Sequence, residues 1–172
     1  MGYYLVEGGR VLGGEYSVGG SKNAVLPILA ATILAQDEVV LENCPLISDF
    51  FVSLDILEEL GCQVHREGRT LTVDSRSLCR TEIGEDMVGR MRSSILFLGA
   101  LLGRASLGHP GGCTIGRRPI DLHLRAFEKM GVHIREVEDI FHCEAPVLLG
   151  YHIYLDYPSV GATENVLLLA VK

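Results

Sequence analysis

The sequence has no tryptophan and few other aromatic residues: five Phe and six Tyr among 172 residues. The interior therefore has to be built from Leu, Ile, Val and Ala, as in layered α/β proteins. Almost half of the residues are apolar and 22% are charged, so the composition is that of a globular chain without a disordered tail. This length is sufficient for one domain with a sizeable core.

A basic cluster is also missing. The formal net charge is −7, and the Lys and Arg residues are spread along the chain. We therefore expect no nucleic acid and no anionic membrane as partners, because both need a basic face. A small anionic substrate is compatible with this charge, since a few focused cations can dominate locally.

The five cysteines include no CxxC pair, and no His forms a helical i, i+4 pair with an acid or a second His. These spacings indicate free thiols in a reducing compartment, and they predict neither a metal site nor another cofactor. The N-terminus lacks a signal peptide, and the longest uncharged apolar stretch, residues 23–36, is shorter than the ~20 residues that span a bilayer. We expect a cytoplasmic protein.

The chain does contain an internal repeat with a step of about seventy residues. One apolar stripe at helical spacing consists of Phe50, Leu54, Leu57 and Leu60 and ends at Gly61. A shift of 70 gives Ile120, Leu124, Phe127 and Met130, ending at Gly131. An alternating strand pattern follows each stripe. Each copy is therefore predicted to hold an amphipathic helix that ends at a glycine and leads into two strands.

A second matched segment precedes each stripe. Val-Gly pairs at positions 18, 88 and 160 each introduce a helix with an apolar run. The repeat units therefore cover about 18–80, 88–150 and 160–172, with the order helix, strand, helix, strand, strand. The third unit stops within its first helix, so the sequence predicts a three-unit α/β module with an incomplete third unit and an open face.

Chemistry is expected where the copies differ. Lys22 opens a helix after a Gly-Gly-Ser run, so backbone N–H groups and a cation would form a cradle for phosphate or carboxylate; the alternative is a solvated Lys in a turn. Arg92 holds the equivalent position in the second unit, and Glu164 lies close to it in the third. Packing around a pseudo-threefold axis would bring these helix starts together, although Arg92 as an ordinary surface cation is the alternative.

The segment 110–119 is the third difference between the copies. Its three glycines make it permissive, and Cys113 lies near Arg117, Arg118 and a helix start, all of which favour the reactive thiolate. The alternative, a small Cys that fills space in the core, fits Cys44, Cys62 and Cys143 better. Asp121, on the first turn of the next helix, is expected either to cap that helix or to accept hydrogen bonds from a ligand.

Four segments carry a family resemblance over essentially the whole chain. These are Gly-Ser-Lys-Asn-Ala at 20–24, Met-Arg-Ser-Ser at 91–94, the Cys113 segment at 110–123, and Ser-Val-Gly-Ala-Thr-Glu-Asn at 159–165. Together they resemble the UDP-N-acetylglucosamine 1-carboxyvinyltransferase family of enolpyruvyl transferases. The resemblance implies an inside-out α/β barrel fold, with two similar domains of three βαβαββ-like units. It places residues 1–21 in the second domain and residues 22–172 in a truncated first domain.

The resemblance also implies a reaction. The enolpyruvyl group of phosphoenolpyruvate would pass to the 3-hydroxyl of UDP-N-acetylglucosamine, the first committed step of peptidoglycan synthesis. Lys22 and Arg118 would bind the phosphoenolpyruvate, Asn23 and Arg92 would hold the sugar nucleotide, and Cys113 would protonate the methylene carbon. Further nucleotide contacts would come from Arg118, Pro119, Ile120, Asp121 and Leu122, and from Tyr157, Pro158, Ser159 and Val160.

In this family the general base and several phosphate-facing arginines belong to the second half, which this sequence lacks. We therefore expect the chain alone to be inactive. Alternatives are a non-catalytic fragment that binds the nucleotide sugar, or a half-enzyme that needs a second polypeptide or self-association to cover its open edge. A shikimate-pathway transferase is a third alternative, which the Gly-Gly-Cys loop disfavours because that enzyme needs no thiol there.

Overall fold

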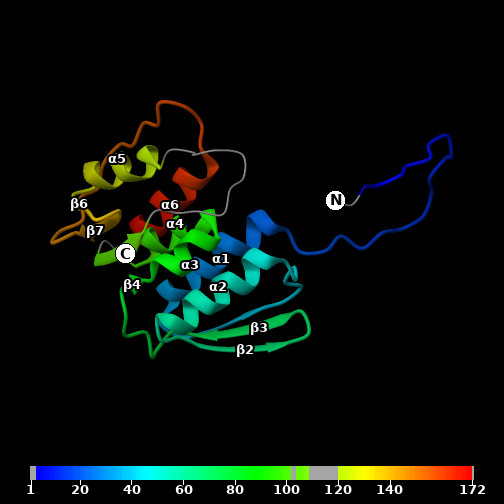
Figure 1. Cartoon of the computed structure of the whole chain (residues 1–172), viewed down its shortest axis with the longest axis horizontal. Coiled ribbons are helices and arrows are strands. Elements are labelled where there is room, and N and C mark those ends of the chain that lie inside the picture. The colour runs from blue at the N-terminus through cyan, green and yellow to red at the C-terminus, as the bar shows by residue number, and fades with distance from the viewer. Residues whose placement is uncertain (1–2, 102–103, 109–119, 172) are drawn as a thin grey trace.

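The repeat predicted from the sequence is visible in the order of the elements. The computed structural model describes residues 3–101, 104–108 and 120–171 (Figure 1). Its first unit contains α1 (Lys22–Ala35), β1 (Glu38–Leu41), α2 (Ser48–Glu59), β2 (Gln63–Glu67) and β3 (Thr70–Asp74). This is the expected order of helix, strand, helix, strand and strand, so the prediction for the first unit is confirmed.

The second unit keeps this order with additions at its start. It contains β4 (Glu82–Ile83), α3 (Glu85–Arg90), the 3-10 helix η1 (Arg92–Ser94), α4 (Ile95–Ala100), β5 (Arg104–Gly108), α5 (Asp121–Lys129), β6 (His133–Val137) and β7 (Ile140–Glu144). The third unit is represented by α6 (Val160–Ala170). The sequence did not predict β4 or α3, because two strand residues and one and a half helical turns are too short to show a period.

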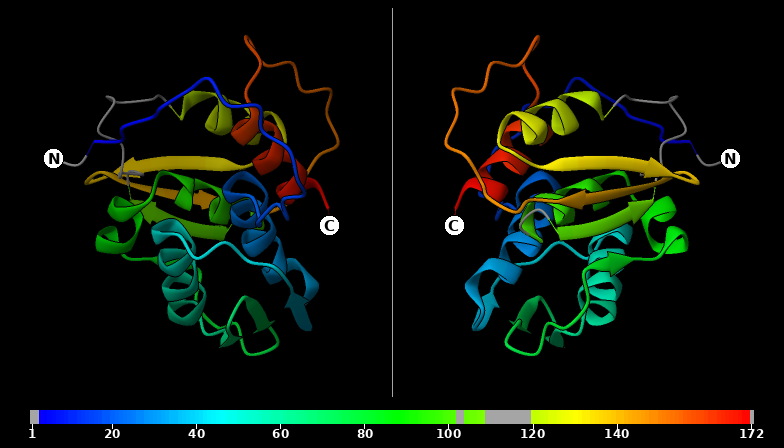
Figure 2. Two further views of the ribbon diagram at one scale, coloured as in Figure 1. Left: turned by 90° about the vertical axis from the view of Figure 1, so that its right-hand side faces the viewer. Right: turned by 90° about the vertical axis from the view of Figure 1, so that its left-hand side faces the viewer.

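The two sheets share one register. Strand order is β1-β3-β2 in the first sheet and β4-β5-β7-β6 in the second, where β4 is parallel to β5 (Figure 2). Gln63 pairs with Asp74, and His133 pairs with Glu144, which is the same pairing shifted by 70. The first strands of the two units are offset by 66 residues and not by 70. Leu41 of β1 pairs with Leu71, and Leu107 of β5 pairs with Phe141. The cause is the first helix, which is shorter in the second unit.

The glycines that end α2 and α5 are also equivalent. Gly61 has φ +98° and Gly131 has φ +92°, a left-handed conformation that favours glycine. In both units the residue before this glycine accepts a hydrogen bond from a later backbone N–H: Leu60 from Cys79 at 3.1 Å, and Met130 from Leu149 at 2.8 Å. The predicted glycine ends are therefore confirmed, together with the bond that each one permits.

One continuous core connects the units. α1, α4 and α6 pack against one another, with α2 beside α1 and α5 beside α6 (Figure 1). The stripe residues Phe50, Leu57, Leu60 and Phe127 are almost completely buried. Cys44, Cys62 and Cys143 are buried too, so their predicted role as small core residues is confirmed, and burial raises the pKa of Cys62 and of Cys143 to about 11.

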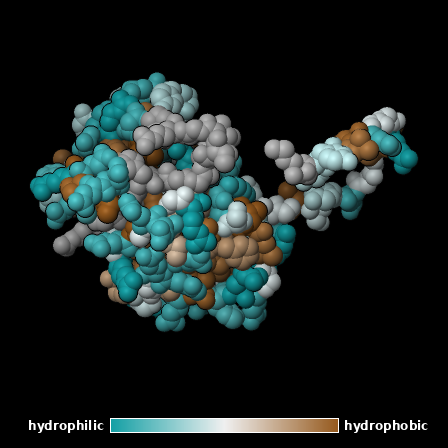
Figure 3. Space-filling model, viewed as in Figure 1, coloured by the Kyte–Doolittle hydropathy of each residue, from teal (hydrophilic) through white to brown (hydrophobic). Residues whose placement is uncertain are grey.

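The segment before α1 contrasts with this core. Residues 3–21 form neither helix nor strand and extend away from the body (Figures 1 and 3). Its exposed apolar residues are Tyr3, Tyr4, Leu5, Val6, Val11, Leu12, Tyr16 and Val18. The assignment of residues 1–21 to a second domain and of residues 22–172 to a first one stays a prediction.

Candidate functional site

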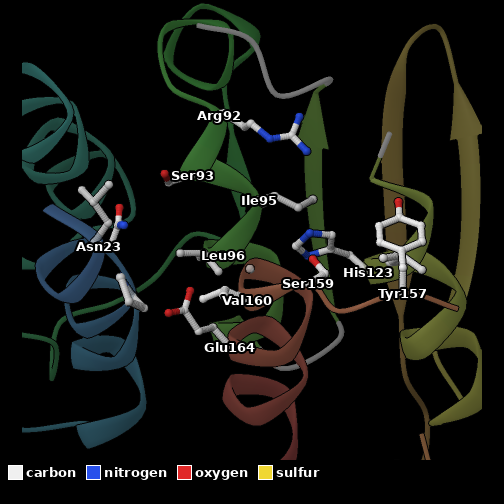
Figure 4. A pocket seen from close by; sticks show the side chains of 14 residues that line it. Asn23, Arg92, Ser93, Ile95, Leu96, His123, Tyr157, Ser159, Val160 and Glu164 are labelled. Carbon is white, nitrogen blue, oxygen red and sulfur yellow. The ribbon is translucent and has the colours of Figure 1, made fainter. Parts of the chain in front are cut away.

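A cavity of about 610 Å³ lies where the helix starts of the three units meet (Figure 4). It is lined by Asn23, Leu26, Pro27, Arg92, Ser93, Ile95, Leu96, Leu122, His123, Tyr157, Ser159, Val160, Gly161 and Glu164. These residues come from α1, from η1 and α4, from α5, and from α6 with the segment before it. The expected convergence of the starts is therefore observed, and Arg92 and Glu164 both reach the cavity.

The cavity collects six of the residues that the resemblance selected. They are Asn23, Arg92, Leu122, Tyr157, Ser159 and Val160. Ile120 is instead half-buried against the core, and Pro158 is exposed outside the cavity lining. Cys113, Arg118 and Pro119, as well as Arg117, lie outside the described residues.

Lys22 does not line this cavity. Its Nζ lies 2.6 Å from Oδ2 of Asp49, at the start of α2. The neighbouring Asn23 does face the cavity, along with Pro27 one turn further on. Pro27 has no N–H to donate to the Asn23 carbonyl, so the helix itself cannot engage that oxygen in the usual i to i−4 bond. At the start of α1, Lys22 is thus paired with Asp49, while Asn23 faces the cavity.

The other wall is fixed by ion pairs and a helix cap. Arg125 on α5 pairs with Asp121 one turn earlier and, at 2.7 Å, with Asp156. Asp156 immediately precedes the cavity residue Tyr157, so these pairs hold that segment against α5. Ser159 then caps α6, because its side-chain oxygen accepts a hydrogen bond from Ala162 N at 3.3 Å.

The expectation that Asp121 caps α5 is wrong. Ile120 is the N-cap residue, and Asp121 is the first residue of the helix itself. The carboxylate of Asp121 is directed to Arg125, an i, i+4 pair that competes with capping. Its role as a ligand acceptor stays a prediction.

His123 is the cavity residue that the sequence did not single out. Its side chain is buried, at 5% exposure, and its Nδ1 lies 3.0 Å from Nδ2 of Asn165. Burial, assisted by the Arg92 cation and opposed by Asp121, lowers the pKa of His123 to about 4. The ring is therefore neutral at physiological pH. Its partner lies 42 residues further along the chain, a distance over which no local spacing rule applies.

A second cavity of similar volume, about 620 Å³, lies near Cys79, Arg80 and Glu82. None of the candidate site residues that the structure describes lines it. The described residues contain no group of three His, Cys, Asp or Glu side chains that could hold a metal ion. Within the same residues, the longest apolar helices are too short or too polar to cross a bilayer. The first cavity is therefore the candidate site.

Comparisons with known sequences identify one family over almost the whole chain. Residues 6–172 match the family model described as EPSP synthase (3-phosphoshikimate 1-carboxyvinyltransferase). UDP-N-acetylglucosamine 1-carboxyvinyltransferase 2 of Caldanaerobacter subterraneus is 47% identical over 99% of this chain and 42% of its own length. UDP-N-acetylglucosamine 1-carboxyvinyltransferase 1 of Symbiobacterium thermophilum is 46% identical over 98% and 40%. This chain thus spans about two-fifths of such relatives.

Solved structures agree on the fold. The enolpyruvyl transferase NikO from Streptomyces tendae superposes with a TM-score of 0.75 and 28% identity, over 88% of this chain and 37% of that protein. An EPSP synthase from Acinetobacter baumannii gives a TM-score of 0.68 at 16% identity, over 91% and 37%. The α/β fold expected from the repeats is thereby confirmed as the fold of these transferases.

Proposed function

Because the chain belongs to the EPSP synthase family of enolpyruvyl (carboxyvinyl) transferases, we propose that it serves the transfer of the enolpyruvyl group from phosphoenolpyruvate to the 3-hydroxyl of UDP-N-acetylglucosamine. One observation carries this proposal: six residues selected for nucleotide-sugar binding, from three separate repeats, line one cavity. Relatives named for this sugar nucleotide are 46–47% identical to the chain over the aligned residues, compared with 16% for a solved EPSP synthase. This difference favours the sugar nucleotide over a shikimate.

The chemistry of the cavity suits a nucleoside diphosphate sugar. Arg92 supplies a guanidinium, and the first turn of α6 supplies backbone N–H groups at Val160 and Gly161. A cation and a helix start together stabilise phosphate oxygens. Leu122 and Tyr157 add an apolar wall for a base or sugar ring. Asn23 offers both a donor and an acceptor, as recognition of a sugar hydroxyl requires.

Transfer itself would use further residues that the resemblance selected. Cys113 would give its proton to the methylene carbon of phosphoenolpyruvate, which leaves positive character on the neighbouring carbon. The sugar hydroxyl would attack that carbon and lose its proton to a base. The thiolate of Cys113 would then take a proton back from the methyl group as phosphate leaves, which regenerates both the double bond and the thiol. Lys22 and Arg118 would neutralise the phosphate and carboxylate charge, with Lys22 exchanging Asp49 for the substrate.

We propose that the isolated chain binds the sugar nucleotide but does not turn it over. The base and further phosphate-binding arginines are expected in the remaining three-fifths of the relatives, as a second domain, a second polypeptide or a second copy. The exposed apolar residues of the segment 3–21 give such a partner a surface to cover. The reaction would take place in the cytoplasm.

Calorimetric titration of UDP-N-acetylglucosamine into the 172-residue chain tests binding. We expect saturable heat, about tenfold weaker affinity for Arg92→Ala because a charge-assisted bond is lost, and no change for the exposed control Arg135→Ala. Absence of heat with the unmodified chain would rule out the binding proposal. A parallel assay with both substrates should release no phosphate; release by the chain alone would show that it is a complete enzyme.

A further inference from the structure

The side chain of Asn165 on α6 is completely buried and meets the backbone of α4 at two points. Its Oδ1 accepts a hydrogen bond from Gly99 N at 3.0 Å, and its Nδ2 donates to Ile95 O at 2.9 Å. A backbone N–H only donates and a carbonyl only accepts, so these two partners fix which end of the carboxamide is oxygen and which is nitrogen.

The helices leave no room for another arrangement at this contact. A Cβ atom at Gly99 would lie 2.3 Å from Oδ1 of Asn165 and 2.5 Å from its backbone oxygen. Gly99 and Ile95 are also the two residues that an α-helix joins by an i to i−4 bond. The carboxamide therefore bridges both ends of one helical turn, which locks α6 against α4 with Asn165 in a single orientation.

The second hydrogen of Nδ2 is directed at His123. Nδ1 of His123, which belongs to α5, lies 3.0 Å from Nδ2 of Asn165. Because Nδ2 is a donor, Nδ1 has to be the acceptor, and a neutral imidazole then carries its proton on Nε2. A proton on Nδ1 would instead set two N–H groups against each other in a buried contact.

The Nε2 edge of this ring lies beside the first turn of α6. A Cβ atom at Gly161 would be 3.8 Å from Nε2 and 3.6 Å from Cε1 of His123, an ordinary contact distance. Figure 4 shows the ring at the cavity wall near Ser159, below Arg92 in this view. The Nε2–H thus borders the same space as the guanidinium of Arg92 and the start of α6.

The charged groups around the His123 ring favour its neutral form, which still donates a hydrogen bond from Nε2. Arg92 approaches from η1, Asp121 belongs to α5 itself, and Glu164 lines the cavity from α6. Burial and the Arg92 cation lower the pKa of His123 to about 4, against a smaller opposing effect of Asp121. A second cation beside Arg92 is thereby avoided, while the hydrogen-bond donor is retained.

We propose that Asn165 is a positioning residue that holds His123 as the neutral ring with its proton on Nε2, aimed at an acceptor oxygen of the ligand in this cavity. The tautomer stands on the geometry of the ligand-free chain alone. The identity of the ligand rests on the proposed function, with an oxygen of UDP-N-acetylglucosamine as the acceptor.

Long-range ¹H–¹⁵N correlation spectra of the ligand-free chain at pH 7 test the tautomer. We expect one neutral ring for His123, with its proton on Nε2 alone. A proton on Nδ1 of His123, or a mixture of the two tautomers, would overturn the proposal. This measurement needs neither a variant nor a ligand.

Asn165→Asp supplies the matched perturbation, because it replaces the donor facing Nδ1 by an acceptor of the same shape. We expect the proton to move to Nδ1, or the ring to become charged near neutral pH. Asn165→Ala removes the donor and should yield a tautomer mixture, and it serves if the Asp variant does not fold. A folded variant of either kind with the proton still on Nε2 alone would show that Asn165 does not set the tautomer.

Two substitutions at His123 test the donor, because a glutamine amide can reach the position of Nε2 while an asparagine amide reaches only that of Nδ1. We expect His123→Gln to bind UDP-N-acetylglucosamine nearly as well as the parent, and His123→Asn to bind about tenfold more weakly. Equal affinities would contradict the donor role. Titrations with UDP and with N-acetylglucosamine separately would assign the acceptor oxygen. If the parent chain binds none of these, the proposed function fails while the tautomer result stands independently.

Discussion

Nζ of Lys22 and Oδ2 of Asp49 lie 2.6 Å apart and join the first residue of α1 to the second residue of α2. A carboxylate at a helix start is stabilised by the helix dipole, while an ammonium there is not. The pair thus neutralises a cation that α1 would otherwise disfavour. It also holds the Lys22 ammonium at the start of α2, so a substrate phosphate would have to replace Asp49 as its partner.

This pair should contribute little to stability. The Lys22 side chain is 53% exposed and that of Asp49 is 23% exposed, so solvent screens their attraction. We expect Lys22→Met to change the free energy of unfolding by less than about 1 kcal/mol. Urea denaturation of Lys22→Met, Asp49→Asn and the double variant would measure it. A coupling energy well above that value would mean that Lys22 is a structural residue and that activity lost on its replacement says nothing about substrate.

His123 should make the stability of the chain depend on pH. An unfolded His has a pKa of about 6.5, and the folded pKa of His123 is about 4. As pH falls from about 6.5 toward about 4, His123 becomes protonated in the unfolded chain but stays neutral in the folded chain. Stability is therefore intact above pH 6.5 and is lost toward pH 4, by about 3 kcal/mol at most.

Urea denaturation at steps from pH 7 to pH 4.5 would measure this loss. His123→Asn should have a flatter profile than the parent, because its position no longer titrates. Parallel curves for the parent and His123→Asn would contradict the lowered pKa and its assignment to burial.

The fold was predictable because its signals are local and occur twice. Two stripes with the same spacing, each ending at a glycine, indicated α2 and α5 and the strands behind them. Elements with no such duplicate, such as β4 and the short α3, were missed. The shorter first helix of the second unit was also missed, because Val88 and Gly89 lie inside the unexpected α3 and not directly before α4.

The site was predictable only in part. Asn23 and Arg92 follow recognisable helix starts, and the structure places both at one cavity. His123 was overlooked because its function depends on Asn165, which comes near only when α5 and α6 pack. The repeat held a usable signal: the fifth residue after each Val is Asn23, Ser93 or Asn165. Two of these line the cavity, and the third supports it from the core.

The glycines that end α2 and α5 should be sensitive to substitution. A Cβ atom at Gly131 would lie 2.8 Å from the Val147 carbonyl oxygen at φ +92°, and one at Gly61 would lie 2.8 Å from Sγ of Cys79 at φ +98°. We expect Gly131→Ala to destabilise the chain by about 1–3 kcal/mol from backbone strain and contact. Thermal or urea unfolding would show it.

Gly89, inside α3, is the matched control. No atom of the described residues lies within 4 Å of a Cβ atom at this position. Gly89→Ala should therefore raise stability by up to about 1 kcal/mol, since alanine is the better helix former. If Gly131→Ala were as stable as Gly89→Ala, the left-handed end of α5 would not be a constraint on the repeat.

Cys113 should be the thiol that a phosphonate epoxide alkylates. Such a reagent joins an anionic group to an electrophile, so it needs both a thiolate and neighbouring cations. Among the other cysteines, Cys62 and Cys143 are buried with pKa values of about 11, and Cys44 is buried as well. Cys79 is exposed and is therefore the real competitor. The selectivity of labelling between Cys113 and Cys79 thus reports whether cations surround Cys113.

Peptide mass spectrometry after a short exposure at pH 7 would locate the adduct, with and without UDP-N-acetylglucosamine. We expect a single adduct at Cys113, none in Cys113→Ala, and an unchanged yield in Cys79→Ala. A neutral alkylating reagent of similar size should lose this preference and label Cys79 as well, because exposure alone then decides. Labelling of Cys79 by the phosphonate in preference to Cys113 would remove the thiol from the proposed reaction, while nucleotide-sugar binding at the cavity would remain open to its own test.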